Sequence, residues 1–199
     1  MLVNWSLILT GNHDIWPYNS TWEAPAPNGD VLFAKTMADD LNNVTLGSSW
    51  FYNTEGPIWD PTYGVESYFQ NFEIKIGRLV FYGLDWNSRR HALSILGYKG
   101  SMPGGSLYDF PGGTFQWLQQ RLKLLSTAPD QFNKVVFLQH QPFRTPWWGP
   151  SWLMTFTSAE KAKFRSMISN ILPVEKYWGV FCGNYSAIYL RDPLQYLIS

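Results

Sequence analysis

The strongest structural signal in this chain is the run Lys134-Val135-Val136-Phe137-Leu138-Gln139-His140-Gln141-Pro142. Four consecutive apolar residues, two of them β-branched, are bounded by polar residues and a proline. A short apolar run with such boundaries is typical of a buried strand. The polar residues that follow it indicate a turn. The run therefore predicts a buried strand that ends in a turn carrying His140.

Other segments of the chain carry similar strand patterns. Two further apolar runs are interpreted as buried strands, Leu7-Ile8-Leu9 and Gly179-Val180-Phe181. Residues 68–76 and 79–84 are predicted to form a hairpin that turns at Gly77-Arg78. The apolar side chains expected on one face of its first strand are those of Phe72, Ile74 and Ile76.

Two segments have the spacing of amphipathic helices. The first is expected to be capped by Thr114 and to run to about Leu125. The second begins with the capping box Thr157-Ser158-Ala159-Glu160 and stops at Pro173. A weaker helical pattern covers residues 31–41. The order of strands and helices predicts one layered α/β or α+β domain.

Composition excludes several classes of protein. The chain has 199 residues, 45% of them hydrophobic, which excludes general disorder. Its formal net charge is zero, so it has no electrostatic footprint for nucleic acid or an anionic membrane surface. A single cysteine, Cys182, excludes an intrachain disulfide. No apolar run is long enough to predict a transmembrane helix. The sequence contains no pattern that indicates the oligomeric state of the protein.

Polar turns follow all three apolar runs. They are Thr10-Gly11-Asn12-His13-Asp14, Gln139-His140-Gln141-Pro142 and Cys182-Gly183-Asn184-Tyr185-Ser186. Ligands of open α/β sheets bind beyond the carboxyl ends of strands, so we expect the turns at 12–13, 140 and 184 to meet around one pocket. A lone histidine is more often structural, but two at equivalent strand ends favour a site. Imidazole nitrogen and amide oxygen suit Mn, Fe or Zn.

These motifs resemble those of calcineurin-like metallophosphoesterases. Gly11-Asn12-His13-Asp14 resembles the family's Gly-Asn-His-Asp/Glu motif, and residues 136–142 resemble its next block, a strand ending in a metal-binding histidine close to a proline. Residues 115–122 resemble the family's Trp-Leu-x-x-x-Leu helix, and Leu84-Asp85 the strand end before it. Residues 179–183 resemble the run into the last motif, Gly-His-x-His. The resemblance spans about Leu7 to Ser186.

The resemblance implies both a fold and a chemistry. The fold would be an α/β/β/α sandwich, with mixed sheets flanked by helices. Asn12, His140 and Asn184 would bind divalent metals of the Mn, Fe or Zn class, normally two. His13 would protonate the leaving oxygen or stabilise the transition state, and Asp14 would orient His13. A metal-activated hydroxide would hydrolyse a phosphate mono- or diester by in-line attack.

The sequence departs from the family pattern at two places. The family's first two motifs, Asp-x-His and Gly-Asp, lie upstream of the Gly-Asn-His-Asp motif, but only ten residues precede Gly11. Asn184 and Ser186 stand where the last motif has histidines. The resemblance therefore implies a single domain, residues 1–199, that lacks its N-terminal strands and first two motifs. We expect this chain alone to be impaired or inactive as a hydrolase.

Aromatic loops support a rival hypothesis, a non-catalytic module that binds a glycan or a protein partner. In the hydrolase hypothesis, Trp147 and Trp148 could stack on the organic part of a substrate, and Arg144 could pair with its phosphate. Packing of the loop onto the domain is the alternative interpretation of these rings. Arg89-Arg90-His91 is expected to be a solvated turn. The tryptophans expected to anchor loops are Trp5, Trp16, Trp22, Trp50 and Trp59.

Four N-glycosylation sequons slightly favour a secreted or lumenal location. Chance would give roughly one or two in such a chain, so coincidence is the alternative. Met1 to Thr10 has no basic segment and no small-residue cleavage site, so it does not fit a signal peptide. The sequon asparagines are Asn4, Asn19, Asn43 and Asn184.

Overall fold

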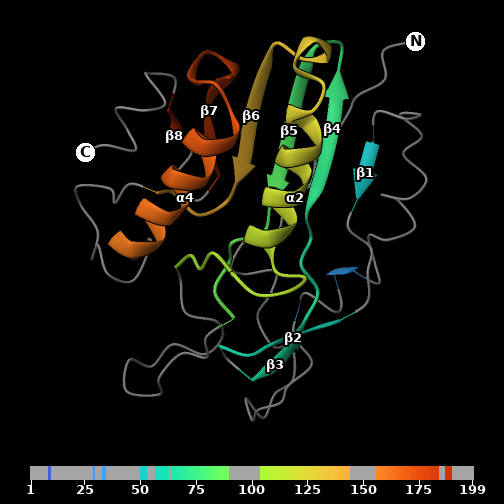
Figure 1. Cartoon of the computed structure of the whole chain (residues 1–199). Helices are drawn as coiled ribbons and strands as arrows, with labels where there is room; N and C mark the ends of the chain where they lie inside the picture. The colour runs from blue at the N-terminus through green and yellow to red at the C-terminus, as the bar shows by residue number, and fades with distance from the viewer. Residues whose placement is uncertain are drawn as a thin grey trace.

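A six-stranded mixed sheet forms the centre of the structure, a computed structural model (Figure 1). The structure describes residues 50–52, 57–62, 64–89, 104–143, 156–183 and 187–189, with single positions 9, 29, 33 and 34. The strand order is β1-β4-β5-β6-β7-β8. The strands are β1 Trp50–Tyr52, β4 Phe72–Ile76, β5 Leu79–Leu84, β6 Lys134–Gln139, β7 Tyr177–Cys182 and β8 Ala187–Tyr189.

Strands β5, β6 and β7 are parallel, and their neighbours β4 and β8 pair antiparallel. Helix α2 (Thr114–Ser126) lies between β5 and β6 in the chain, and α4 (Ser158–Ile171) lies between β6 and β7. Both helices cover the same face of the sheet (Figure 1). The carboxyl ends of the three parallel strands therefore share one edge, the lower edge in Figure 1, which we call the carboxyl edge.

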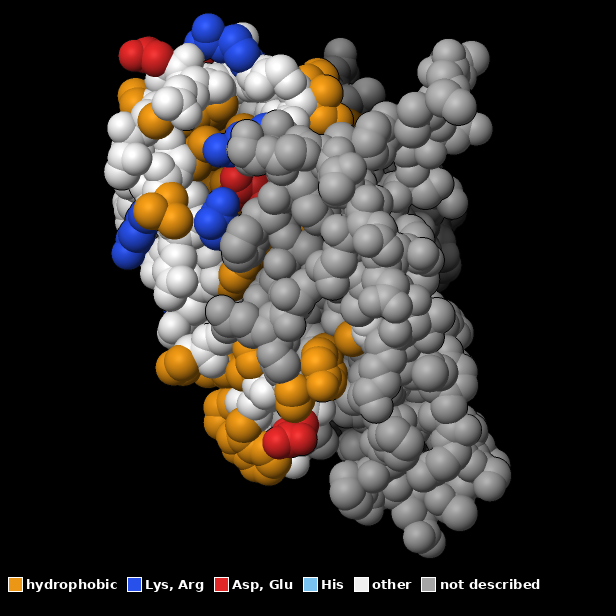
Figure 2. Space-filling view, turned by 90° about the vertical axis from the view of Figure 1, so that its right-hand side faces the viewer, with side chains coloured by type: hydrophobic (Ala, Val, Ile, Leu, Met, Phe, Trp, Pro, Cys, Tyr) orange, Lys and Arg blue, Asp and Glu red, His pale blue; other side chains and the backbone are white. Residues whose placement is uncertain are grey.

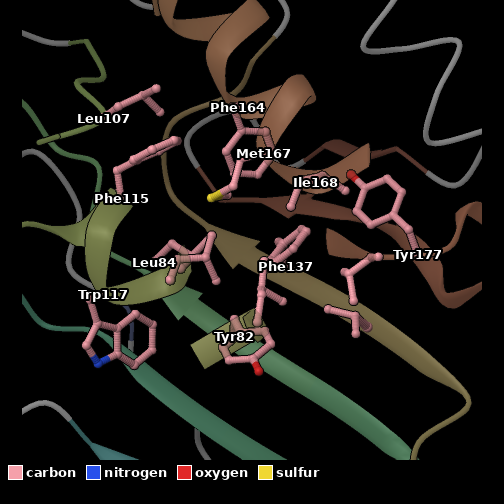
Figure 3. Close-up of a cluster of buried hydrophobic side chains, with 14 of the residues drawn as sticks. Tyr82, Leu84, Leu107, Phe115, Trp117, Phe137, Phe164, Met167, Ile168 and Tyr177 are labelled. Atoms are coloured by element: carbon pink, nitrogen blue, oxygen red, sulfur yellow. The ribbon is translucent and has the colours of Figure 1, made fainter. Parts of the chain in front are cut away.

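The main core lies between this face of the sheet and the two helices. Apolar side chains from β5, β6, α2 and α4 converge there (Figure 3). Leu118 and Leu122 of α2 and Phe164 of α4 are each 0% exposed. The helical spacing of these residues is therefore the physical reason that both segments pack as amphipathic helices.

The opposite face of the sheet also buries apolar side chains. Phe72 and Ile74 of β4 are each 1% exposed, and they pair in register with Gly83 and Phe81 of β5. Val136 of β6 is 0% exposed and lies outside the main core. A sheet that is apolar on both faces fits a layered α/β fold.

The predicted hairpin is confirmed, but its first strand is shorter than expected. It begins at Phe72 rather than residue 68, because the backbone N–H of Gln70 and the side chain of Asn71 bond to Asp85. Ile76 is 56% exposed, so it does not share the buried face expected of it. The predicted strands at 134–138 and 179–181 are confirmed as β6 and β7.

Both well-marked helices are confirmed, with one correction. The capping box of Thr157 and Glu160 starts α4 as expected. Gly113, not Thr114, is the N-cap of α2. The hydroxyl of Thr114 instead donates to the carbonyl oxygen of Asp85, at 2.8 Å, which ties the first turn of the helix to the end of β5.

A small second sheet was not expected from the sequence. Strands β2 (Ile58–Asp60) and β3 (Val65–Ser67) pair antiparallel between β1 and β4 in the chain. Trp59 belongs to β2 and is 60% exposed, so the prediction that it anchors a loop is wrong. Two 3-10 turns, Pro129–Gln131 and Val174–Lys176, precede β6 and β7. The predicted strand at 7–9 and helix at 31–41 lie outside the described residues, apart from single positions.

Candidate functional site

Of the residues predicted to form the site, the structure describes His140. It directly follows β6 at the carboxyl edge and is half-buried. The convergence of the turns at 12–13, 140 and 184 therefore stays a prediction. The predicted site residues outside the described part are Asn12, His13, Asp14, Arg144, Trp147, Trp148 and Asn184.

The ends of β6 and β7 bring two of the sequence motifs side by side. Gln139 pairs in register with Cys182, and the backbone N–H of Gly183 donates to the carbonyl oxygen of Gln139 at 3.0 Å. A Cβ at position 183 would lie 3.4 Å from Nδ1 of His140, so the imidazole lies close to this glycine. His140 thus lies beside Gly183, the residue that precedes Asn184 in the sequence.

A buried ion pair lies at the end of β5. The guanidinium of Arg89 donates from Nη1 to Oδ1 of Asp85 at 2.8 Å and from Nη2 to Oδ2 at 2.7 Å. Arg89 is 4% exposed and Asp85 is 1% exposed. The prediction of a solvated turn at Arg89 is therefore wrong, because the bidentate partner that draws this arginine inward lies four residues earlier.

Several further groups hold the Asp85 carboxylate. Besides Arg89, the backbone N–H of Gln70 donates to Oδ2 at 3.2 Å, and Nδ2 of Asn87 donates to Oδ1 at 3.1 Å. Burial alone would raise the pKa of Asp85. The charge of Arg89 and these hydrogen bonds outweigh burial, so the pKa lies below its usual value. Asp85 is therefore ionised and neutralised within the protein.

Tyr108 adds a second anchor for the Arg89 turn. Its hydroxyl donates to the carbonyl oxygen of Asn87 at 2.6 Å and accepts from the backbone N–H of Arg89 at 2.8 Å. The rings of Phe69 and Tyr108 lie 4.8 and 5.4 Å from the guanidinium carbon. Tyr108 has φ of 50°, a left-handed conformation that is costly for a bulky residue. The surrounding bonds maintain this conformation.

Polar side chains link the ends of all three parallel strands. Gln139 accepts from the indole N–H of Trp86 at 3.1 Å, and Nε2 of Gln141 donates to Oδ1 of Asn87 at 3.3 Å. The thiol of Cys182 donates weakly to the carbonyl oxygen of Gln141, with a sulfur–oxygen distance of 3.9 Å. We call Trp86, Asn87, Gln139, Gln141 and Cys182 the strand-end network.

The described residues contain no group of three or more His, Cys, Asp or Glu side chains that could bind a metal ion. Asp85 does not add a ligand to His140, because both of its oxygens accept hydrogen bonds and Arg89 balances its charge. The sequence analysis gave Arg89, Asn87 and Gln141 no part in the site, although Gln141 lies in the turn that carries His140. A signal was present, since charged and amide residues directly follow predicted buried strands, where they require partners.

No family model, curated protein or solved structure matches this chain. No similarity to another protein therefore bears on the fold or the site, and both follow from this chain's own residues. They define a mixed α/β protein with a polar, hydrogen-bonded carboxyl edge that carries His140. In the described part of the chain, neither helix has the length and apolar character needed to cross a bilayer.

Proposed function

We propose that the carboxyl edge is the metal- and phosphate-binding edge of a calcineurin-like metallophosphoesterase domain, with an α/β/β/α sandwich. The observation that carries the proposal is the position of His140 beside Gly183, at the ends of two adjacent parallel strands. These are the strand ends at which the resemblance has its metal-binding histidine and its Gly-His-x-His motif. The apolar second face of the sheet supports a further layer.

In this proposal each predicted residue has a defined role. Asn12, His140 and Asn184 would hold a divalent metal, which would supply Lewis-acid activation of water and charge neutralisation at the phosphoryl group. His13 protonates the leaving oxygen, and Asp14 keeps the imidazole of His13 oriented. Arg144, Trp147 and Trp148 contact the phosphate and the organic part of the substrate. Asn184 and Ser186 are poor replacements for histidines, so we propose weak metal binding and slow hydrolysis.

The proposal is tested by titrating the chain with Mn²⁺ and Zn²⁺ by calorimetry and by assaying hydrolysis of an aryl phosphate. We expect weak binding and slow hydrolysis, both lost in His140→Ala. His91→Ala removes a histidine from outside the predicted motifs and serves as the matched control. Absence of metal binding by the wild-type chain, or equal loss in both variants, would contradict the proposal.

A gain-of-function variant tests the same ligand assignment. Replacing the last motif by Asn184→His with Ser186→His supplies two imidazoles where the resemblance has them. Imidazole is a stronger ligand than an amide or hydroxyl for these metals, so we expect metal affinity to rise about tenfold or more. Calorimetry that shows no gain would contradict the assignment of Asn184.

A specific surface favours the second candidate function, a glycan-binding module. Trp59 of β2 is 60% exposed and pairs in register with the exposed Glu66 of β3. Figure 2 shows hydrophobic side chains with an acidic group at the end of the molecule where Figure 1 draws β2 and β3. A tryptophan face can stack on a sugar ring while a carboxylate accepts its hydroxyl groups.

Tryptophan fluorescence distinguishes this candidate from the hydrolase. Titration with a panel of neutral oligosaccharides should change the emission of the wild-type chain but not of Trp59→Ala. Trp178→Ala removes another exposed tryptophan, 48% exposed at the opposite end of the sheet, and should respond as wild type. Equal loss of response in both variants would count against the β2–β3 surface.

A further inference from the structure

We propose that Gln141 is a positioning residue for His140, acting with Gln139 and Asn87. The inference rests on the proposed function, because it concerns the same histidine. The two glutamines flank His140 in the sequence, and both are 0% exposed. Their side chains and backbones connect the His140 turn to the strands on both sides.

Gln139 closes the turn around His140. Its side-chain oxygen accepts from Trp86 on the β5 side at 3.1 Å, while its side-chain nitrogen donates to the carbonyl oxygen of Gln141. The amide group therefore spans the histidine, and joins the residue before it to the residue after it. This arrangement restricts the backbone at position 140.

Gln141 fixes the other side of the turn. Its side-chain nitrogen donates to Oδ1 of Asn87 at 3.3 Å. Its backbone carbonyl oxygen also accepts a weak hydrogen bond from the thiol of Cys182. These contacts reach the ends of β5 and β7 respectively. Gln141 thus links the His140 turn to both neighbouring strands.

Asn87 provides a rigid attachment for Gln141. It donates to Asp85 through both its backbone and its side chain, and its carbonyl oxygen accepts from Tyr108 and Arg89. The bond from Gln141 to Asn87 therefore connects the His140 turn, through Asn87, to the buried Asp85–Arg89 ion pair. Movement of the His140 turn would break several bonds between groups that have little access to water, each of which is costly.

A buried polar network costs more free energy than an apolar core, so a network on both sides of one half-buried histidine indicates a role. Ligands of metals and phosphates gain affinity when neighbouring hydrogen bonds hold them in the bound orientation. A fixed His140 would lose little conformational freedom on binding. The network therefore supplies preorganisation, while the ligating atom belongs to His140.

The test compares Gln141→Leu with the wild-type chain. Leucine retains much of the volume but removes the bond to Asn87. We expect Mn²⁺ affinity to fall about tenfold or more, the range found when partners of metal ligands are removed. In the metal-free chain, we expect nitrogen-detected NMR of the imidazole of His140 to show averaged tautomers and broadened lines.

The matched control is Glu73→Gln, which breaks a different, partly buried ion pair, with Arg121, on the helix-covered face of the sheet. It should lower stability but leave the His140 spectrum and Mn²⁺ affinity unchanged. If Gln141→Leu does not melt cooperatively, Asn87→Ala removes the same bond from the other side, and the same changes are expected.

The outcomes separate the two proposals. If the wild-type chain binds no metal, the proposed function fails, and the NMR comparison still decides whether Gln141 positions His140. If the wild-type chain binds Mn²⁺ but folded Gln141→Leu or Asn87→Ala retains both the affinity and the His140 spectrum, the positioning role is overturned while the proposed function stands. Equal effects of Glu73→Gln would also overturn it, because they would indicate a general loss of stability.

Discussion

Asp85 and Arg89 illustrate how a single side chain can determine local structure. The sequence predicted a solvated turn at Arg89-Arg90-His91, but the guanidinium of Arg89 is buried in a bidentate ion pair with Asp85. The sequence does indicate that a polar residue follows the strand. It does not indicate that Arg89 pairs with Asp85, or that the hydroxyl of Tyr108, 19 residues after Arg89, accepts from the backbone N–H of Arg89.

Removing one partner of this ion pair should be strongly destabilising. Arg89→Leu leaves the Asp85 carboxylate buried and unpaired, so we expect the free energy of unfolding to fall by about 3–5 kcal/mol. Urea denaturation measures the change. Lys75→Leu removes the more exposed partner of Glu73 and should cost less than about 1 kcal/mol. Losses of similar size in the two variants would contradict the importance of burial.

Cys182 should be chemically inert in the folded chain. Burial raises the pKa of its thiol to about 12, despite opposing hydrogen bonds from Gln139 and Phe143. The thiolate is the reactive form, so we expect negligible labelling by a maleimide at pH 8 and rapid labelling in denaturant. Rapid labelling of the folded chain at this pH would show that the end of β7 is less buried than described.

At the scale of elements, the sequence predicted the pieces that have strong local signals. The hairpin turn at Gly77-Arg78, strand β6 and the capping box of α4 all follow from patterns within a few residues. The N-cap of α2 was misplaced because Thr114 has a better partner in Asp85, which is distant in the sequence. Local patterns do not contain such long-range competition.

The capping box at the start of helix α4 allows the contribution of a helix cap to stability to be measured. The hydroxyl of Thr157 accepts from the backbone N–H of Glu160 at 3.2 Å, and Glu160 reaches back to the backbone of Thr157. Thr157→Ala should reduce the free energy of unfolding by about 1 kcal/mol. Thr157→Ser retains the acceptor and should remain within a few tenths of the wild-type value. Equal losses in thermal or urea unfolding would contradict the capping role.

Packing between β4 and β5 depends on Gly83. A Cβ at this position would lie 2.1 Å from a ring carbon of Phe72, so Gly83→Ala forces the ring to move. We expect a loss of about 1–3 kcal/mol, as for other overpacked cores. In a Phe72→Ala background the same change should cost much less. A double-mutant cycle with no coupling between the two positions would contradict this contact.

At the scale of the whole molecule, the sequence predicted a mixed α/β domain but not the order of its strands. The site was less predictable than the sheet. His140 could be assigned to a strand end from its flanking residues alone. The parallel crossovers bring Gly183 beside it, and bring Trp86 and Asn87 to the glutamines on either side of it. The resemblance to a known family suggested the first of these neighbours only.

Acid should weaken the whole fold through Asp85. Its pKa is lower in the folded chain than in the unfolded chain, where an aspartate titrates near about pH 3.9. The ion pair therefore contributes fully above that pH, and its contribution is lost as the pH falls through the lower folded value. We expect urea unfolding at pH 2–6 to show a weaker pH dependence for Asp85→Asn. An unchanged slope would assign acid sensitivity to other groups.

The position of β6 between β5 and β7 has a consequence for synthesis on the ribosome. The β4–β5 hairpin can close as soon as residue 84 emerges, but the free edge of β5 has to wait for β6, after a helix and two loops have been made. During that interval an apolar strand presents unpaired backbone groups to other nascent chains. We therefore expect the yield of correctly assembled protein to depend on translation speed between residues 84 and 139.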